Sequence, residues 1–436
     1  MNFDDSIEYL YNLGNEVLAM KLGLENIGKL LDALGNPENN YLKVQIAGTN
    51  GKGSTCAFLE AICLSAEISV GMTTSPHLIS ATERVRINGV EISEEDFARH
   101  ATIIRETSEK LVERGELETV PTYFEQVTAI ALNAFAESNI ELAILETGLG
   151  GRFDATTAAK AEIVAITSID YDHQRILGDT LSKIAAEKAA IIRESTKAVI
   201  APQQKEAEKI ILERCREVGV EPVCVSEDFQ IKKQSFEINT PQITLNFSTE
   251  TDVYHDIVLG LAGKHQIVNA LVAVKLAEML RDFGFEIEKE NIWTGLEKAR
   301  HRGRLEFYEG ILFDGAHNVS GAKALREYLD EFIKQPIVMI FGAMRDKDLS
   351  EIAEILFPKA DRLILTRVEN QRSMTAEELR EFVPPNFDKN NVIVVQNVRE
   401  ALQTAQNIAL NKELICVTGS LYLVGEAQKI LSGNVL

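Results

Sequence analysis

The stretch that decides the fold is LKVQIA, residues 42–47, followed by Gly48-Thr49-Asn50-Gly51-Lys52-Gly53-Ser54. The apolar run predicts a buried strand, and an apolar helical pattern begins at about Ser54. The glycines between them let the backbone wrap around a phosphate, and N–H groups at the start of the helix point toward the anion. Lys52 adds a positive charge for the outer phosphates. The stretch therefore predicts a phosphate-binding loop between a strand and a helix.

This loop departs from the common P-loop pattern G-x-x-x-x-G-K-[ST] in two places. Ile46 stands at the first glycine position, and Gly53 separates Lys52 from the hydroxyl of Ser54. The alternative interpretation is a glycine-rich turn that binds no ligand.

The rest of the chain alternates short apolar runs with longer helical patterns, which predicts an α/β fold with a mostly parallel sheet. Further strands are expected in the first part of the chain at residues 69–74, 142–145 and 163–167, and helices at 124–136, 181–192 and 265–280. Residues 229–259 alternate polar and apolar positions and predict hairpins at the edge of the first domain. A second α/β series has expected strands at 311–313, 337–341, 363–366, 392–395 and 414–418. The length of 436 residues favours two domains, 1–298 and 299–436.

Polar residues follow several of these strands, at the edge where open α/β sheets bind ligands. Glu146 begins the sequence ETGLGGRFD, and a carboxylate there is suited to Mg²⁺, which prefers oxygen ligands. The alternative is that Glu146 caps a helix or pairs with Arg152. The sequence SPH from Ser75 offers another oxygen ligand after the strand at 69–74.

Two histidine-containing sequences also follow strands. Asp170-Tyr171-Asp172-His173 suggests a metal site, although a lone histidine is more often a structural residue. In the second domain, DGAHN (314–318) predicts either one wall of a reaction cleft between the domains or a turn with an asparagine near a helix start.

Composition excludes several classes of function. The formal net charge of -21 argues against general nucleic-acid binding. No apolar run approaches the roughly 20 residues that span a bilayer, and the acidic N-terminus does not resemble a secretory signal, so a cytoplasmic protein is expected. The five cysteines match no metal or redox spacing and are expected to be small buried hydrophobic residues: Cys56, Cys63, Cys215, Cys224 and Cys416.

Together the motifs resemble the folylpolyglutamate synthase/dihydrofolate synthase family, a branch of the Mur ligase superfamily. The resemblance runs from GTNGKGS through TSPHL, TYFEQVTAIA, LETGLGGRFDAT, DHQRILGDTLSKIAAEKAAI, HQIVNA, GRLEF and FDGAHN to TGSLYLVGE. It implies a P-loop Mur-ligase-like domain, a smaller Rossmann-like C-terminal domain, and an active site between them. The implied reaction is ATP-dependent addition of L-glutamate to dihydropteroate, reduced folates or both.

The resemblance also implies roles for particular residues. ATP phosphates would lie on Gly51, Lys52, Gly53 and Ser54, and further nucleotide contacts would come from Asn269, Arg304 and Asp314. Two magnesium sites are implied, one at Ser75 and Glu146 and one at His173, with Lys188 as a carbamate beside the metal. The pterin or pteroate pocket would include Thr122, Tyr123, Phe124, Glu125 and Arg152. The catalytic residues would be Lys52, Lys188, and the two near the incoming glutamate, His317 and Ser420.

Three alternatives stay open at this point. Many relatives have Pro-Gly-Arg at the domain junction where this chain has Arg302-Gly303-Arg304, so Arg302 competes with Arg304 for the nucleotide role. Lys188 could be an ordinary surface lysine paired with Glu187 or Asp179. The whole chain could be another amino-acid ligase of the superfamily or a non-catalytic nucleotide-binding module. The protein is expected to act as a monomer on small molecules, with no nucleic-acid or membrane partner.

Overall fold

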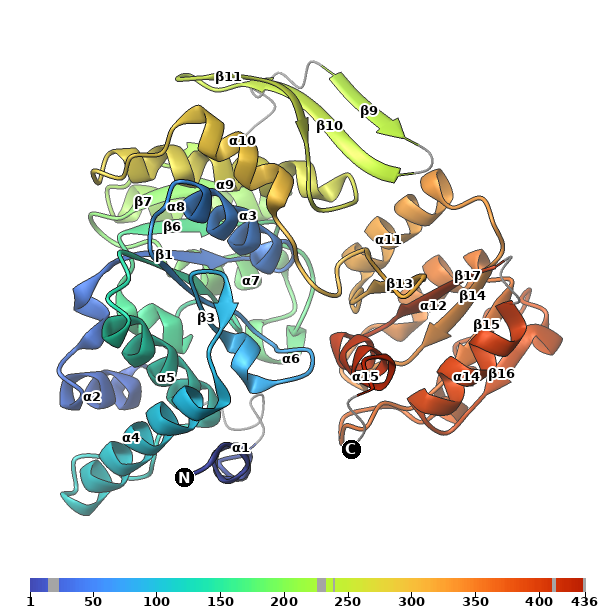
Figure 1. Ribbon diagram of the computed structural model, residues 1–436, viewed down its shortest axis with the longest axis horizontal. Coiled ribbons are helices and arrows are strands. Elements are labelled where there is room, and N and C mark those ends of the chain that lie inside the picture. Colours follow the sequence, from blue (N-terminus) through green and yellow to red (C-terminus); the bar gives the residue numbers. More distant parts are fainter. Residues whose placement is uncertain (15–22, 226–232, 238–239, 410–412, 434–436) are drawn as a thin grey trace. The chain divides into compact units, whose positions relative to one another are not determined.

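The computed structural model describes residues 1–14, 23–225, 233–237, 240–409 and 413–433. The chain forms two compact units, each built from more than one segment (Figure 1). Unit 1 comprises Met1–Ile169, Thr180–Gln230 and Val268–Ala299, and unit 2 comprises Asp170–Asp179, Ile231–Ile267 and Arg300–Leu436. The predicted α/β class is confirmed, and the division into domains at residue 298 stays a prediction.

Unit 1 is built on an eight-stranded sheet with the order β4-β3-β2-β5-β1-β6-β7-β8. The strands β2, β5, β1, β6, β7 and β8 run parallel, and β3 and β4 add an antiparallel edge. Their bounds are β1 (Leu42–Ala47), β2 (Val70–Thr73), β3 (Val85–Ile87), β4 (Val90–Glu91), β5 (Leu142–Glu146), β6 (Ile163–Ile166), β7 (Lys197–Ile200) and β8 (Val223–Cys224). The central strands β1, β5 and β6 are buried except for Leu42 at the start of β1, because helices cover both faces.

Two helix layers cover this sheet (Figure 1). The helices α3 and α10 pack together on one face, and the pair α4 and α5 packs with α1 and α2 on the other. The helices of unit 1 are α1 (Phe3–Asn12), α2 (Glu25–Ala33), α3 (Lys52–Ser65), α4 (Glu94–Glu113), α5 (Tyr123–Glu137), α7 (Leu181–Ala189), α8 (Lys205–Glu217), α9 (His265–Arg281) and α10 (Lys289–Lys298). Short 3₁₀ turns lie at Pro37–Asn40, Ala81–Arg84 and Ala155–Ala159. The first residues of α9 belong to unit 2, because the boundary falls at Val268.

Unit 2 contains a six-stranded sheet with the order β12-β13-β17-β14-β15-β16. All neighbours run parallel except β12, which pairs antiparallel with β13 at the edge. The strands are β12 (Glu306–Tyr308), β13 (Ile311–Asp314), β14 (Ile337–Phe341), β15 (Arg362–Leu365), β16 (Val392–Val394) and β17 (Leu414–Thr418). The helices are α6 (Gln174–Leu177), α11 (Val319–Phe332), α12 (Leu349–Leu356), α13 (Ala376–Arg380), α14 (Val398–Ala409) and α15 (Leu421–Leu431), with 3₁₀ turns at Phe357–Lys359 and Lys389–Asn391.

A separate antiparallel sheet, β11-β10-β9, is formed by β9 (Lys233–Glu237), β10 (Thr240–Ser248) and β11 (Val253–Val258). The hairpins expected at residues 229–259 are therefore present, apart from 229–232 and 238–239, which lie outside the described residues. The structure groups this sheet with unit 2 rather than with the edge of the first domain. One physical reason is that Lys264, just after the sheet, pairs with Glu327 and Glu331 of α11.

Two smaller expectations differ from the structure. The helix expected at 181–192 ends at Ala189, and Cys224 is exposed, whereas Cys56, Cys63, Cys215 and Cys416 are buried as expected. Cys224 is exposed because it ends the edge strand β8. Among the described residues, no helix combines the length and the apolar character that crossing a membrane requires.

Candidate functional site

The loop between β1 and α3 has the geometry of a phosphate cradle. Gly51 adopts a φ of 90°, which favours glycine, and a Cβ atom built on it would lie 2.3 Å from Oδ1 of Asn269. Asn269 of α9, which is 6% exposed, is thus held directly against this loop. Gly48 approaches Thr167 just as closely, since its added Cβ would lie 1.9 Å from Oγ1. The loop is therefore pressed against its neighbours at two points where only glycine fits.

Two lysine side chains meet at this loop. Lys52, the first residue of α3, donates from Nζ to the carbonyl oxygens of Gly48 at 3.1 Å and Thr49 at 3.2 Å. Lys188, from the last turn of α7, donates from Nζ to the same Gly48 oxygen at 2.8 Å. Lys188 is only 4% exposed, so the alternative of an ordinary surface lysine is wrong. Two ammonium groups on one side of a glycine loop make a local positive site in an acidic protein.

The residues predicted for the first magnesium ion lie side by side. Glu146 ends β5 and Ser75 follows β2, and these two strands are neighbours in the sheet. The Ser75 backbone N–H donates to Oε2 of Glu146 at 3.0 Å. Arg152 pairs with Glu187 at 2.9 Å, so the alternative in which it pairs with Glu146 is wrong. Glu146 is 7% exposed, and a buried carboxylate beside the phosphate-binding edge suits a hard cation.

Four of the residues predicted for the pterin pocket, 122–125, lie at the start of helix α5, whereas Arg152 lies in the loop after β5. Thr122 and Glu125 form a capping box, in which Thr122 Oγ1 accepts from the Glu125 N–H and the Glu125 carboxylate accepts from the Thr122 N–H. The ring of Phe124 lies against Gly148 in the loop after Glu146, where an added Cβ would be 2.6 Å from Cζ. Tyr123 is buried and stacks on Tyr11 at 5.7 Å between centroids. Phe124 therefore packs the start of α5 against the glycine-rich loop after Glu146.

In unit 2, the predicted nucleotide residues Arg304 and Asp314 are neighbours. Burial raises the pKa of Asp314, against the opposing effect of the Arg304 charge and of hydrogen bonds from the backbone N–H groups of Leu305 and Ala316. Arg302 instead donates to the side-chain oxygen of Gln428 at 3.1 Å. The arrangement favours Arg304 over Arg302 for the nucleotide role.

His317 and Ser420 are the two residues predicted to lie near the incoming glutamate substrate. They follow the adjacent strands β13 and β17. Ser420 is the N-cap of α15 and its Oγ accepts from the Leu423 N–H at 3.1 Å. The His317 Nδ1 lies 2.7 Å from the Gly315 carbonyl oxygen. Asn318 caps α11, which confirms the expected asparagine at a helix start.

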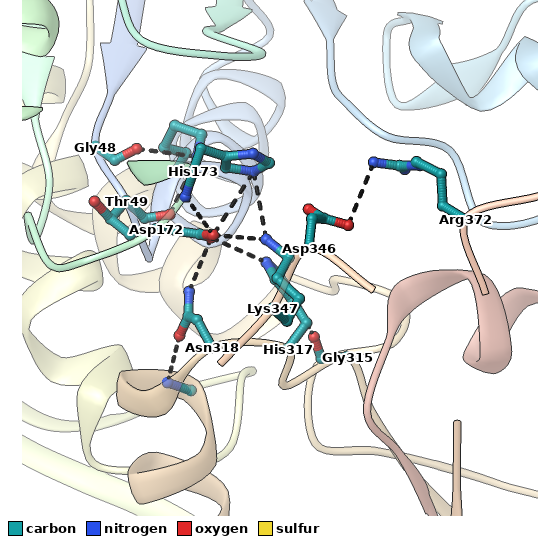
Figure 2. Close-up of polar contacts among 12 residues, drawn as sticks. Gly48, Thr49, Asp172, His173, Gly315, His317, Asn318, Asp346, Lys347 and Arg372 are labelled. Carbon is teal, nitrogen blue, oxygen red and sulfur yellow. Dashed lines mark hydrogen bonds and ion pairs between the residues drawn. The ribbon is translucent and has the colours of Figure 1, made fainter. Parts of the chain in front are cut away.

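The structure also assembles a polar cluster that the sequence did not predict as a unit, which we call the Asp172 cluster (Figure 2). Lys347 Nζ lies 2.6 Å from Asp172 Oδ1 and 3.4 Å from His173 Nε2. On the other carboxylate oxygen, Asn318 Nδ2 lies at 3.3 Å and His317 Nε2 at 3.6 Å. The cluster consists of Asp172, His173, His317, Asn318 and Lys347, all in unit 2.

Charge within the cluster controls its protonation. Burial would raise the pKa of Asp172, but the His317 ring beside its Oδ2 and the charge of Lys347 outweigh burial and lower that pKa. Burial and the Lys347 charge lower the pKa of His173 to about 4, and the same two causes lower the pKa of His317. Neutral imidazoles retain a lone pair, which a metal or a proton can use.

Sequence reasoning missed Lys347 altogether. It lies in RDKD (345–348), shortly after the predicted strand at 337–341, and charged residues after a parallel strand were the signal used elsewhere in the chain. Asp172 was quoted only as part of an acidic run. Its central place depends on contacts from residues 146 and 175 positions away, which no local pattern reveals.

Within the part of the chain that the structure describes, no group of three or more His, Cys, Asp or Glu side chains could hold a metal ion by itself. A magnesium ion would therefore take hydroxyl, water or phosphate oxygens in addition to Glu146 or His173. That is the usual way in which Mg²⁺ is bound at phosphate sites. The residues present fit such an ion.

Comparison with known protein families gives two matches that together cover most of the chain. Residues 46–277 match the Mur ligase middle domain, and residues 303–421 match the Mur ligase glutamate ligase domain. The dihydrofolate synthase/folylpolyglutamate synthase of Bacillus subtilis is 32% identical, over 96% of this chain and 97% of the relative.

Two solved structures share the fold over almost the whole chain. Mycobacterium tuberculosis folylpolyglutamate synthase, complexed with ADP and AMPPCP, matches with a TM-score of 0.88 at 30% identity and covers 98% of this chain and 99% of that one. E. coli FolC in complex with DHPP and ADP matches with a TM-score of 0.87 at 28% identity, over 100% and 98% of the two chains.

Proposed function

Because this chain belongs to the dihydrofolate synthase/folylpolyglutamate synthase family of Mur ligases, we propose that it joins L-glutamate to dihydropteroate, a reduced folate or both, using ATP. The family matches confirm the resemblance that the sequence motifs indicate. The relatives with this name span both units, which favours a complete ligase over a non-catalytic nucleotide-binding module.

One structural observation carries the proposal. Lys52 and Lys188 both point to the Gly48 carbonyl, while Glu146 and Ser75 meet at the neighbouring strand ends. A glycine loop with the Lys52 ammonium binds and neutralises a polyphosphate, and the adjacent carboxylate suits its divalent cation. We assign the ATP phosphates to Gly51, Lys52, Gly53 and Ser54, and the remaining nucleotide contacts to Asn269, Arg304 and Asp314.

The chemistry needs a good leaving group on a carboxylate. Transfer of the terminal phosphate of ATP to the substrate carboxylate forms an acyl phosphate and releases ADP. The glutamate amine then attacks the acyl carbon, and the tetrahedral intermediate expels phosphate to leave an amide. Lys52 neutralises charge on the phosphates as it shifts, and His317 and Ser420 orient the incoming glutamate.

Magnesium bound at Glu146 and Ser75, and a second ion at His173, would supply charge neutralisation at the transferring phosphate. We assign Lys188 a carbamate, since a protonated lysine has no lone pair and could not face a cation. Its burial beside the phosphate loop supports this assignment. Phe124, with Thr122, Tyr123, Glu125 and Arg152, is assigned to the pterin or pteroate pocket.

A panel of acceptors tests the function. The full chain is incubated with Mg-ATP, L-glutamate and one of dihydropteroate, tetrahydrofolate, or its formyl and methylene forms, and products are resolved by mass. We expect at least one acceptor to gain a glutamyl residue. If none gains glutamate, while an acceptor of another Mur ligase does gain an amino acid, the folate assignment is wrong. A monomeric state and a cytoplasmic location stay predictions.

A further inference from the structure

The ammonium group of Lys347 lies beside His173, the residue to which the second metal ion is assigned. It is 2.6 Å from Asp172 Oδ1 and 3.4 Å from His173 Nε2, and these two acceptor atoms are 3.8 Å apart (Figure 2). Two ligand atoms that each lie about 2.1 Å from one Mg²⁺ can be at most about 4.2 Å apart. The oxygen and the nitrogen are therefore close enough to share one ion.

The rest of the cluster fixes the direction of the Asp172 carboxylate. The His173 backbone N–H donates to Oδ1 at 2.8 Å, whereas Asn318 and His317 lie against Oδ2 at 3.3 and 3.6 Å. Contacts from the loop after β13 thus hold one oxygen, and the other faces Lys347 on the loop after β14. The carboxylate is oriented whether or not Lys347 is present.

The pocket requires a positive charge. The Asp172 and Lys347 side chains are 10% and 9% exposed, so the carboxylate is largely removed from water. A buried charge without a partner is strongly destabilising, and the Lys347 ammonium lies 2.6 Å from this carboxylate. A cation in contact with Oδ1 is therefore part of the stable arrangement.

We propose that Asp172 and His173 form one cation position, which the Lys347 ammonium and a divalent metal ion occupy in alternation. This extends the proposed function, on which it rests for the metal at His173, by adding Asp172 as an oxygen ligand and Lys347 as a resident competitor. An ammonium has three donors and no lone pair, so it uses the same acceptor atoms as the metal and cannot share them. Metal binding here requires Lys347 to withdraw.

Manganese titration of the full chain tests the competition without any turnover. Free Mn²⁺ is counted by electron paramagnetic resonance in the presence of saturating ADP, for the unaltered protein and for Lys347→Met. Removal of the competing charge should tighten the weaker class of Mn²⁺ sites by at least about tenfold. The matched control is Lys323→Met on α11, a lysine of the same unit that is 64% exposed and pairs with Glu351. It should leave Mn²⁺ affinity unchanged.

Further variants keep the test decisive. Lys347→Gln serves if Lys347→Met does not fold, and adding Asp172→Asn to either should abolish the gain in affinity. Equal Mn²⁺ affinity in the unaltered protein and a folded Lys347 variant would overturn the proposal, as would a gain that survives Asp172→Asn. Glutamylation by the unaltered protein is measured separately. Ligation without the Mn²⁺ effect refutes only the shared position, and the Mn²⁺ effect without ligation refutes only the proposed function.

Discussion

The phosphate loop of unit 1 and the Asp172 cluster of unit 2 are built in opposite ways. The phosphate loop is a run of seven residues, 48–54, that follows β1 and includes the first residues of α3, and the sequence predicts it directly. The Asp172 cluster takes its side chains from three segments, at residues 172–173, 317–318 and 347. The first is specified by local backbone requirements, and the second by tertiary contacts. Substitutions in the phosphate loop should therefore change the fit of the backbone and the charge near the phosphates. Substitutions in the Asp172 cluster should change the pairing of buried charges.

The largest effect is expected at Lys52. Lys52→Ala removes a charge that interacts more strongly with the phosphates as the reaction proceeds, so turnover should fall on the order of 10²- to 10³-fold. Steady-state ADP release with saturating substrates measures the change. Lys209→Ala, on the exposed face of α8 in the same unit, is the control and should retain full turnover. If Lys52→Ala stays within a few-fold of the control, Lys52 has no role in the reaction.

Lys188 offers the next test, because it combines burial with a proposed modification. Lys188→Ala should lower turnover about 100-fold, and short carboxylic acids should restore part of it by occupying the vacated space. Mass spectrometry under carbon dioxide should also detect the carbamate on the unaltered chain. Lys183→Ala on the same helix is the control. An unmodified Lys188 and a variant that no carboxylic acid restores would together contradict the assignment.

A substitution of Glu146 tests the proposed magnesium site at Glu146 and Ser75. Glu146→Gln keeps the shape and the acceptor for the Ser75 N–H but removes the negative charge. The magnesium concentration needed for half-maximal activity should rise roughly 10- to 100-fold, while the melting temperature changes little. Glu213→Gln on α8 is the charge-matched control. Removal of magnesium by a chelator should abolish activity in all of them, and unchanged magnesium dependence in Glu146→Gln would show that the ion binds elsewhere.

The smallest effect is expected for a substitution of Gly51. It separates the cost of a positive φ from the cost of a clash between Cβ and Asn269. Gly51→Ala forces a side chain into a positive φ, which costs about 1–2 kcal/mol, and also drives Cβ against Asn269. Gly219→Ala imposes a similar φ of 67° with no atom within 4 Å of its Cβ. Chemical denaturation should show a larger loss of stability for Gly51→Ala, accompanied by weaker nucleotide binding. If the two variants lose equal stability, the Asn269 side chain moves aside at no cost in free energy and does not shape the loop.

The sequence predicts this protein well where a local pattern determines the structure. The bounds of β1, β14 and β17 agree with expectation to the residue, because each is a buried apolar run between clear breaks. Glu146 and Ser75 were expected at one edge because the carboxyl ends of parallel strands converge. Lys188 was expected only through family resemblance, since its burial depends on packing between α7 and the loop at Gly48.

The sequence predicts less where distant segments meet. Lys347 and the central place of Asp172 were missed, because each is an ordinary charged residue until unit 2 brings them together. The hairpins at 229–259 were predicted, but their place in unit 2 depends on contacts such as the pairing of Lys264 with α11. Local periodicity carries no information about such partners.

The most direct test of the account follows an isotope through the reaction. The acceptor carboxylate is labelled with a heavy oxygen isotope, and the full chain is supplied with Mg-ATP and L-glutamate. If an acyl phosphate forms, the carboxylate oxygen that becomes its bridging atom leaves with phosphate, so one labelled oxygen should appear in inorganic phosphate for each amide formed, together with ADP. Transfer of the labelled oxygen to AMP would contradict the proposed mechanism. Amide formation that releases only unlabelled phosphate would contradict it as well.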